Sequence, residues 1–171
     1  TIYAVAQGGS GDNDVEWVKK SIDGGTTWGT LTIPLMVEDD ETHFTRGQAF
    51  YDLILAVHPS NPNFVLAGGI DMHRTQDGGT TWTGISHWYG GFGKPEVHAD
   101  QHAIQFRPDH SDEVIFGNDG GIFYSTNAGN GAATPSFIMK NTGYNVTQFY
   151  SCAAENAKNS HYFLAGAQDN G

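Results

Sequence analysis

Basic residues, cysteine and long apolar stretches are all scarce in this sequence. Eight Lys and Arg stand against 19 Asp and Glu, which gives a formal net charge of −11 with neutral His. Lys and Arg do not cluster anywhere along the chain. Because phosphate binding depends on such clusters, we expect no nucleic-acid partner and no affinity for anionic lipid.

The one cysteine, Cys152, lies in the apolar stretch FYSCAAE. It excludes an internal disulfide, and we expect a buried small side chain rather than a nucleophile. No apolar run approaches the roughly 20 residues of a membrane span, so no span is expected. The chain begins at TIYAV, without Met and inside an expected strand. We therefore expect it to be a piece of a longer protein, and the lack of a signal peptide says little about its compartment.

Long runs of Ala, Glu, Lys and Leu are missing as well, which argues against a helical protein. The chain instead has 23 Gly, 12% aromatic residues, and short apolar runs separated by Gly, Asp and Asn. This punctuation is typical of short strands joined by tight turns. A length of 171 residues suffices for one domain with a sizeable core. The sequence predicts an all-β domain.

One octet of residues occurs twice, as SIDGGTTW at 21–28 and as TQDGGTTW at 75–82. Asp23 and Asp77 are 54 residues apart, and a further 50 residues lead to Asn127 in the degraded copy STNAG. The flanking segments repeat in the same order, at 55–71, 104–120 and 152–171. A period of this size indicates a repeat architecture.

Each repeat unit divides into four expected strands. In the unit that contains the second octet, strands are expected at 52–57, 64–67 and 72–75, and a fourth begins at Thr80. The turn HPSNP follows the first strand, where its prolines prevent the ladder from continuing. Four antiparallel strands in about fifty residues make one blade of a β-propeller.

We therefore predict a single β-propeller segment of about three and a half blades over residues 1–171. The blades are expected at 1–33 (partial), 49–86, 100–140 and 148–171 (partial). A closed propeller usually has about four to eight blades. The segment is thus expected to be incomplete, with the remaining blades supplied by the same longer chain or by another subunit.

The octet resembles the Asp box, also called the bacterial neuraminidase repeat, with the pattern S/T-x-D-G-G-x-T-W. The segment 98–128 is similar to the secreted glycosyl-hydrolase-like and sortilin-like propellers. The resemblance covers essentially the whole chain and implies a β-propeller that is secreted or displayed on the cell surface. It is highly specific for the fold and weakly specific for function.

We expect the octets to be structural. Asp23 and Asp77 should accept hydrogen bonds from backbone N–H groups of their own turns, where glycines can take positive φ. The threonines should tie the end of each turn, and the tryptophans should pack into the blade. The structural residues predicted in this way are Asp23, Gly25, Thr27, Trp28, Asp77, Gly79, Thr81 and Trp82. Calcium or ligand binding is the alternative.

Propeller topology predicts where a ligand site would open. The octets join the third and fourth strands, so the turns between the second and third strands lie on the opposite face. These turns are at 68–73, 117–122 and 167–171, and the connections between blades at 34–48, 86–99 and 141–148 share their face. The residues expected to point there are Asp71, Asp119, Asp169, His98 and Asp100.

Asp71 and Asp119 are the candidate catalytic residues, because hydrolysis of a glycoside needs carboxyl groups on two sides of the bond. In the xyloglucan-degrading propellers that the chain resembles, the catalytic aspartates lie in a D-x-G-G-like turn before the third strand. The sequence NDGGIFYS places Asp119 in a similar context. The alternative for both is an aspartate that caps a tight turn.

His98, Asp100 and His102 alternate, so on a strand they would share one face, as metal ligands must. Aligning the prolines that follow the inner strands, however, places His102 opposite Leu53 in a buried series. We therefore predict a polar network and no bound transition metal, with His98 and Asp100 facing a ligand.

Trp88 and Tyr89 lie among glycines in the connection 86–99, and exposed rings of this kind stack on the C–H faces of sugars. Their alternative role is to fill the gap between adjacent blades. The acidic run EDDETH could hold a structural calcium ion through residues 39–41, or form a solvated loop. No other cofactor is expected.

Three functions fit these residues. The first is a secreted, glycosyl-hydrolase-like propeller that binds carbohydrate or protein on the face opposite the octets. The second is a xyloglucanase-like glycoside hydrolase, with one carboxylate outside this segment. The third is a sortilin-like receptor module for peptides. Binding is favoured because no catalytic constellation is complete here, and the three arginines do not converge as a sialidase requires.

Overall fold

The computed structural model describes residues 1–9, 11–144, 147, 149–155 and 162–167 of the 171-residue chain. The chain divides into two compact units, Thr1–Lys140 and Asn141–Gly171. Within the described ranges, every regular element is a strand except one short 3₁₀ helix, η1 (Ala128–Asn130). The predicted all-β fold is confirmed. No helix in the described part of the chain has the length and apolar character needed to cross a membrane.

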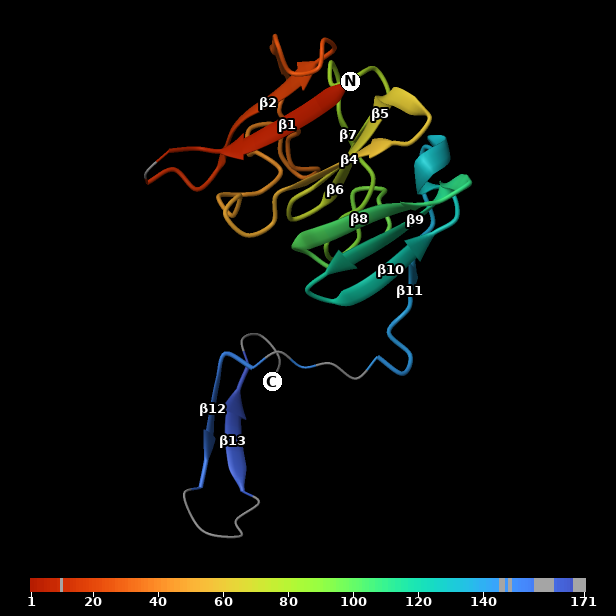
Figure 1. Ribbon diagram of the computed structural model, residues 1–171. Helices are drawn as coiled ribbons and strands as arrows, with labels where there is room; N and C mark the ends of the chain where they lie inside the picture. Colours follow the sequence, from red (N-terminus) through yellow and green to blue (C-terminus); the bar gives the residue numbers. More distant parts are fainter. Residues whose placement is uncertain (10, 145–146, 148, 156–161, 168–171) are drawn as a thin grey trace. The chain divides into compact units, whose positions relative to one another are not determined.

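Figure 1 shows the strands, which follow one another in simple meanders. In the first unit they are β1 (Ile2–Gln7), β2 (Val15–Ser21), β3 (Gly29–Leu31), β4 (Ile54–His58), β5 (Asn61–Gly68), β6 (Met72–Thr75), β7 (Thr83–Gly84), β8 (Gln101–Arg107), β9 (His110–Asn118), β10 (Gly121–Ser125) and β11 (Ile138–Met139). The second unit holds the antiparallel hairpin of β12 (Ser151–Ala154) and β13 (Phe163–Gly166).

The described strands of the first unit form three antiparallel sheets, with the orders β1-β2-β3, β4-β5-β6-β7 and β8-β9-β10-β11. Strands that are consecutive in the chain are neighbours in each sheet, which is the arrangement of a propeller blade. Two four-stranded blades, with three strands before them and two after them, agree with the predicted incomplete propeller.

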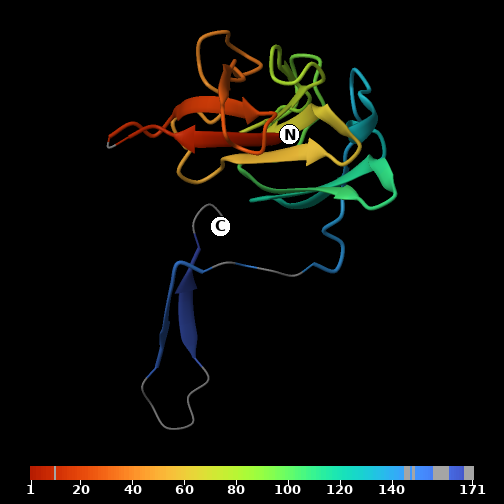
Figure 2. The ribbon, with the colours of Figure 1, turned by 45° about the horizontal axis from the view of Figure 1, so that its top comes forward.

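Successive sheets pack against one another through apolar side chains, and Figure 2 shows them side by side in sequence order. One core cluster joins the second sheet to the third, with Leu66 and Met72 packing among Phe106 and Phe116. A second cluster joins the first sheet to the second through Val18, Phe44 and Ala67, among others. These contacts are those of adjacent blades, and burial of this apolar surface stabilises them.

The pairing registers place the two kinds of turn at opposite ends of the second sheet. Ile54 on β4 pairs with Gly68 on β5, which in turn pairs with Met72 on β6. At the other end, Val65 pairs with Thr75, the first residue of the second octet. The turn between β5 and β6 and the octet therefore lie on opposite faces, as the topology predicts.

Both octets form the same hydrogen-bonded turn. Asp77 Oδ1 accepts from the backbone N–H groups of Thr80 and Thr81, each at 3.0 Å. In the first octet, the Thr27 amide and hydroxyl donate to Asp23 at 2.9 and 2.6 Å. Led by the Thr27 hydroxyl, these bonds lower the pKa of Asp23 to about 2. Both aspartates thus accept hydrogen bonds within their own turns, and the assignment of the octets as Asp boxes stays a prediction.

The two octet tryptophans differ in their surroundings. The Trp82 indole N–H donates to the Thr32 carbonyl oxygen at 3.0 Å, and its ring packs against the apolar cluster between the first two sheets. Trp28 is 41% exposed, and its N–H bonds to Gly25 in its own turn. Trp28 thus departs from the expectation that it packs into the blade, because no described segment covers it as Thr32 covers Trp82.

Three local features differ from what the sequence predicts. The third, degraded copy of the octet forms η1 in place of the octet turn, and the Ser125 hydroxyl oxygen accepts from the Ala128 amide at 3.0 Å. Strand β5 already begins at Asn61, so Pro62 lies within it. Cys152 is exposed, since it belongs to a two-stranded hairpin whose strands are exposed throughout.

Candidate functional site

Three aspartates gather at the end of the second and third sheets that lies opposite the octets. Asp119 is in the turn between β9 and β10, Asp100 directly precedes β8, and Asp52 precedes β4. Asp100 and Asp119 are close enough for a hydrogen bond between their carboxyl groups, and the charges of both act on Asp52. Together with Tyr51 and His102, these aspartates form what we call the acidic site.

Asp119 is exposed, and two donors fix its carboxylate. The Tyr51 hydroxyl donates to it from 3.0 Å, and Nε2 of His102 lies 2.7 Å from its Oδ1. The Tyr51 and His102 rings meet edge to face with their centroids 4.7 Å apart. Because 37% of the Asp119 side chain is accessible, the carboxylate is oriented and still open to a ligand.

Asp100 is strained and shares its environment with Asp119. Its φ of 65° lies in the left-handed region that non-glycine residues seldom adopt. Burial, followed by the charge of Asp119, raises the pKa of Asp100. The neighbouring carboxylate disfavours a charge on Asp100, which therefore binds its proton more tightly than an ordinary aspartate.

Asp52 is the fully buried aspartate of the acidic site. Neither of its carboxyl oxygens has a hydrogen-bond partner among the residues that the structure describes. Burial, and then the charge of Asp100, raise the pKa of Asp52 to about 8. The group is therefore protonated near neutral pH and does not touch a ligand.

His98 lies beside the acidic site, where the sequence places it. A Cβ atom on Gly120 would come within 2.4 Å of the Cβ of His98, so any larger residue at Gly120 would displace the histidine. His98 is exposed, and its Nδ1 lies 3.2 Å from the Ala99 carbonyl oxygen. The structure thus brings His98, Asp100 and Asp119 together.

His102 corrects a prediction. The sequence predicts that it belongs to the buried series of Ile104 and Phe106, but it is exposed and Gln101 is buried instead. A bulge between Gln101 and Ala103 shifts the alternation of the strand by one residue. The three residues His98, Asp100 and His102 therefore do not share one strand face, although His102 joins the site through Asp119.

Asp71 lies in a different cluster. It is fully buried in the turn between β5 and β6, where its described neighbours are Glu38 and His87. Burial, and then the charge of Glu38, raise the pKa of Asp71 to about 7. The structure does not bring Asp71 together with Asp119 as a carboxyl pair within the described contacts, so a catalytic role for either stays a prediction.

Trp88 and Tyr89 are exposed, as expected, but they belong with the cluster of Asp71. The Tyr89 ring lies 4.2 Å from the His87 ring, and 4.6 Å from that of Trp88. In the described part of the chain, neither ring contacts the acidic site. Asp169, the remaining ligand-binding candidate, lies outside the described residues.

A scan against protein-family models finds no matching family, and a search of curated proteins finds no significant match. Among solved structures, the chain is similar to the crystal structure of an ancestral GH74 enzyme, with a TM-score of 0.46 and 18% sequence identity. The match covers 79% of this chain and 18% of that one, so this chain spans less than a fifth of its length. At this level of likeness, the fold assignment rests on the strand pairing of the chain itself.

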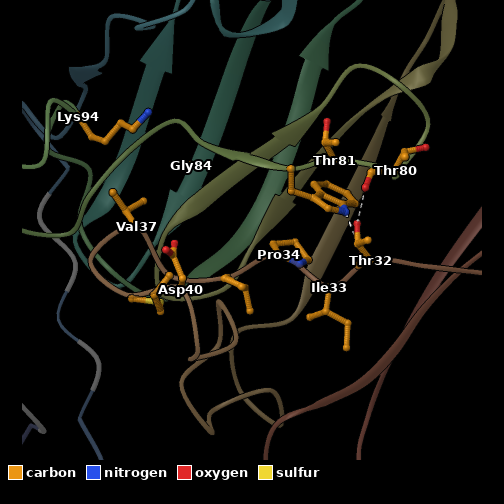
Figure 3. A pocket seen from close by; sticks show the side chains of 12 residues that line it. Thr32, Ile33, Pro34, Val37, Asp40, Thr80, Thr81, Gly84 and Lys94 are labelled. Atoms are coloured by element: carbon orange, nitrogen blue, oxygen red, sulfur yellow. Dashed lines mark hydrogen bonds between the residues drawn. The ribbon is translucent and has the colours of Figure 1, made fainter.

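An open pocket of about 410 Å³ lies apart from the acidic site, between the connection after β3 and the second octet (Figure 3). Its charged wall residues are Asp40 and Lys94, and no residue of the acidic site lines it. The neighbouring Asp39 accepts from the backbone N–H groups of Glu41 and Thr42, each at 2.7 Å. Asp39 thus caps its own turn, and calcium binding there stays a prediction.

Sequence reasoning missed Tyr51 and Asp52. The signal that could have found Asp52 is the alignment of Pro59 with Pro108, which places Asp52 opposite Gln101. Gln101 begins β8 and Asp52 lies just before β4, and both hold a polar side chain that is fully buried. Polar residues that recur at the start of successive apolar strands predict that these positions face the site.

Proposed function

We propose that this chain is part of a β-propeller that binds a neutral carbohydrate at the acidic site. The observation that carries the proposal is the exposed Asp119 carboxylate, held by two donors beside the exposed Tyr51 ring. A carboxylate accepts strong, charge-assisted hydrogen bonds from sugar hydroxyls. An aromatic ring offers a flat apolar surface to the C–H face of a sugar.

The surroundings of the site support a neutral, hydroxyl-rich ligand. Phe50 is 63% exposed, and its ring lies 6.5 Å from that of Tyr51, which extends the aromatic surface. The largest charge effects on the pKa values of Asp52 and Asp100 come from other aspartates and from histidines. With a net charge of −11, the chain repels anionic ligands.

A second candidate function is glycoside hydrolysis. It is favoured by the raised pKa of Asp100 beside Asp119, because a carboxyl group that holds its proton more tightly than usual can act as a general acid. However, hydrogen-bonded carboxyl groups are closer together than the roughly 5–5.5 Å that retention requires, or the ~6.5–9.5 Å of inversion. A hydrolase built on this site would therefore need an opposing carboxylate from another blade.

The proposal is tested by probing the 171-residue chain against immobilised neutral oligosaccharides, uronic-acid and sialylated glycans, and random peptides. We expect binding to neutral glycans, with anionic glycans at least about tenfold weaker, the difference that 1.4 kcal/mol makes. Binding to peptides alone, or to no glycan, would refute it. Release of reducing ends from a bound glycan would favour the hydrolase over the binding module.

A secreted or cell-surface location is part of the same proposal, and its support is the resemblance of the octets to the Asp box. Detection of the protein in the medium or on the surface of the source cells would agree with it. Retention inside intact cells would contradict it.

A further inference from the structure

Glu38, Asp71 and His87 converge in the interior of the first unit. They come from three separate segments: the connection after β3, the turn between β5 and β6, and the connection after β7. One carboxylate oxygen of each acid and one ring nitrogen of the histidine all lie within 4.8 Å of one another. We call this group the buried triad.

Several buried polar atoms of the buried triad lack the hydrogen bonds that such groups normally have within the described residues. Asp71 and His87 are fully buried, yet in the described part of the chain neither oxygen of Asp71 and neither ring nitrogen of His87 makes a hydrogen bond of standard geometry, although the Trp88 backbone N–H lies close enough to Asp71 to act on its pKa. Oε2 of Glu38 is also buried and unbonded, although it lies 3.3 Å from Nε2 of His87. Burial of unpartnered polar groups is costly, and each case calls for an explanation such as a bound ion.

We propose that the buried triad binds one divalent transition-metal ion, with Zn²⁺ as the best fit. An imidazole and two carboxylates are all ligand types that zinc uses, and three protein ligands leave a fourth position for water. In a tetrahedral zinc site with bonds of about 2.0–2.1 Å, two ligand atoms are about 3.3 Å apart. The 3.3 Å between Glu38 Oε2 and His87 Nε2 matches that edge.

Calcium and magnesium fit the buried triad less well. Calcium takes about six to eight oxygen ligands, and magnesium is bound by one or two carboxylates with several waters. Imidazole nitrogen suits zinc and other late transition metals. A buried histidine among the ligands therefore favours a transition metal over the two hard cations.

Neighbouring side chains orient the ligands and shield them from water. Arg46 Nη1 donates to Oε1 of Glu38 at 3.2 Å, which leaves Oε2 for an ion. The rings of Tyr89 and Phe92 lie 4.2 and 5.0 Å from the His87 ring. Such outer contacts commonly fix metal ligands and control solvent access. In this proposal, the aromatic residues of the connection after β7 shield the metal site instead of binding a sugar.

The test is calorimetric titration of the chelator-treated chain with ZnCl₂. We expect one zinc ion per chain. In Glu38→Gln the affinity for zinc should be at least tenfold weaker, because even the loss of a residue that only hydrogen-bonds to a metal ligand commonly costs roughly 10–100-fold in metal affinity. Glu41→Gln removes an exposed acid three residues away, and His110→Ala removes an exposed histidine. Both control variants should bind zinc as the wild type does.

A second readout keeps the result independent of folding. Co²⁺ in a four-coordinate site gives strong visible absorption bands, which we expect for the wild type and not for Glu38→Gln, with unchanged far-ultraviolet circular dichroism in both. Failure to bind one zinc ion, or equal affinity in Glu38→Gln, would overturn the proposal. Tighter binding of Ca²⁺ than of Zn²⁺ would contradict the assignment of the metal.

Discussion

The carboxyl group of Asp52 is buried, and no described residue forms a hydrogen bond with it. Burial and the charge of Asp100 raise its pKa from 3.8 to about 8. The unfolded chain releases this proton near pH 4, whereas the folded chain keeps it until about pH 8. Between these values the folded state binds more protons. The stability from this group is therefore fully present below pH 4 and is lost as the pH rises through about 8.

Asp52→Asn should remove this dependence while keeping the shape of the neutral acid. From pH 5 to pH 8, we expect the wild type to lose up to about 1.4 kcal/mol of unfolding free energy per pH unit relative to the variant, the value for one proton. Urea unfolding at each pH measures the difference. Parallel pH profiles for the two proteins would show that Asp52 is not protonated in the folded state.

At the residue scale, the sequence predicts the members of the site that lie in turns and connections better than the fully buried one. His98, Asp100 and Asp119 follow from the turn pattern of the repeat. Asp52 lies at the start of an apolar run, so the sequence predicts only that a strand begins there. Its burial depends on how two blades pack, which no local pattern reveals.

At the element scale, the two octets provide a matched comparison. Gly25 and Gly79 occupy the same position, and each has a φ of +94°. A Cβ atom on Gly79 would come within 2.4 Å of Leu31 Cδ1 in the preceding sheet, whereas one on Gly25 would only touch Trp28 at 3.7 Å. Comparing a glycine-to-alanine substitution at the two positions therefore separates the free-energy cost of backbone strain from the cost of crowding between blades.

Gly25→Ala should destabilise the chain by about 1–2 kcal/mol, the cost of a left-handed conformation in a non-glycine residue. Gly79→Ala should cost about 2–4 kcal/mol, because overpacking adds roughly 1–3 kcal/mol to the same strain. Chemical denaturation of both variants measures the difference. Equal losses would mean that the second octet does not pack against the first sheet as described.

Strand positions within the blade follow from the repeat period and the alternation of apolar residues. Strand β6 is found where the sequence predicts it, at Met72–Thr75. The bulge at the start of β8 is not predictable in this way, because a bulge leaves the composition of a strand unchanged. That one irregularity exposes His102 and buries Gln101.

At the scale of the whole molecule, the hairpin of the second unit, taken by itself, leaves a large amount of apolar surface uncovered. Tyr162, Phe163 and Leu164 are 81%, 70% and 80% exposed, and they lie at or next to β13. An isolated two-stranded hairpin is only marginally stable in water, and exposed apolar strands invite pairing. We propose that this hairpin is covered by further blades, from the same longer chain or from another subunit.

The 171-residue chain on its own should therefore self-associate at micromolar concentrations. Leu164→Glu should shift it toward the monomer, while Thr134→Glu, which adds the same charge at an exposed site of the first unit, should not. Sedimentation velocity over a range of concentrations measures the effect. A wild-type chain that stays monomeric would contradict the proposal.

The blade architecture is predictable from the sequence because the repeat period and the residues of its turns recur along the chain. The number of blades and the ligand are not predictable, since both depend on surfaces that pack beyond any one repeat.

The central claim is that Asp119 and Tyr51 bind a neutral glycan. Calorimetric titration with the glycan that binds best on the array tests it most directly. We expect Asp119→Asn to bind about 10–100-fold more weakly, the loss of one charged hydrogen bond, while Asp112→Asn, at the opposite end of β9, binds as the wild type does. Equal affinity in Asp119→Asn and the wild type would contradict the account.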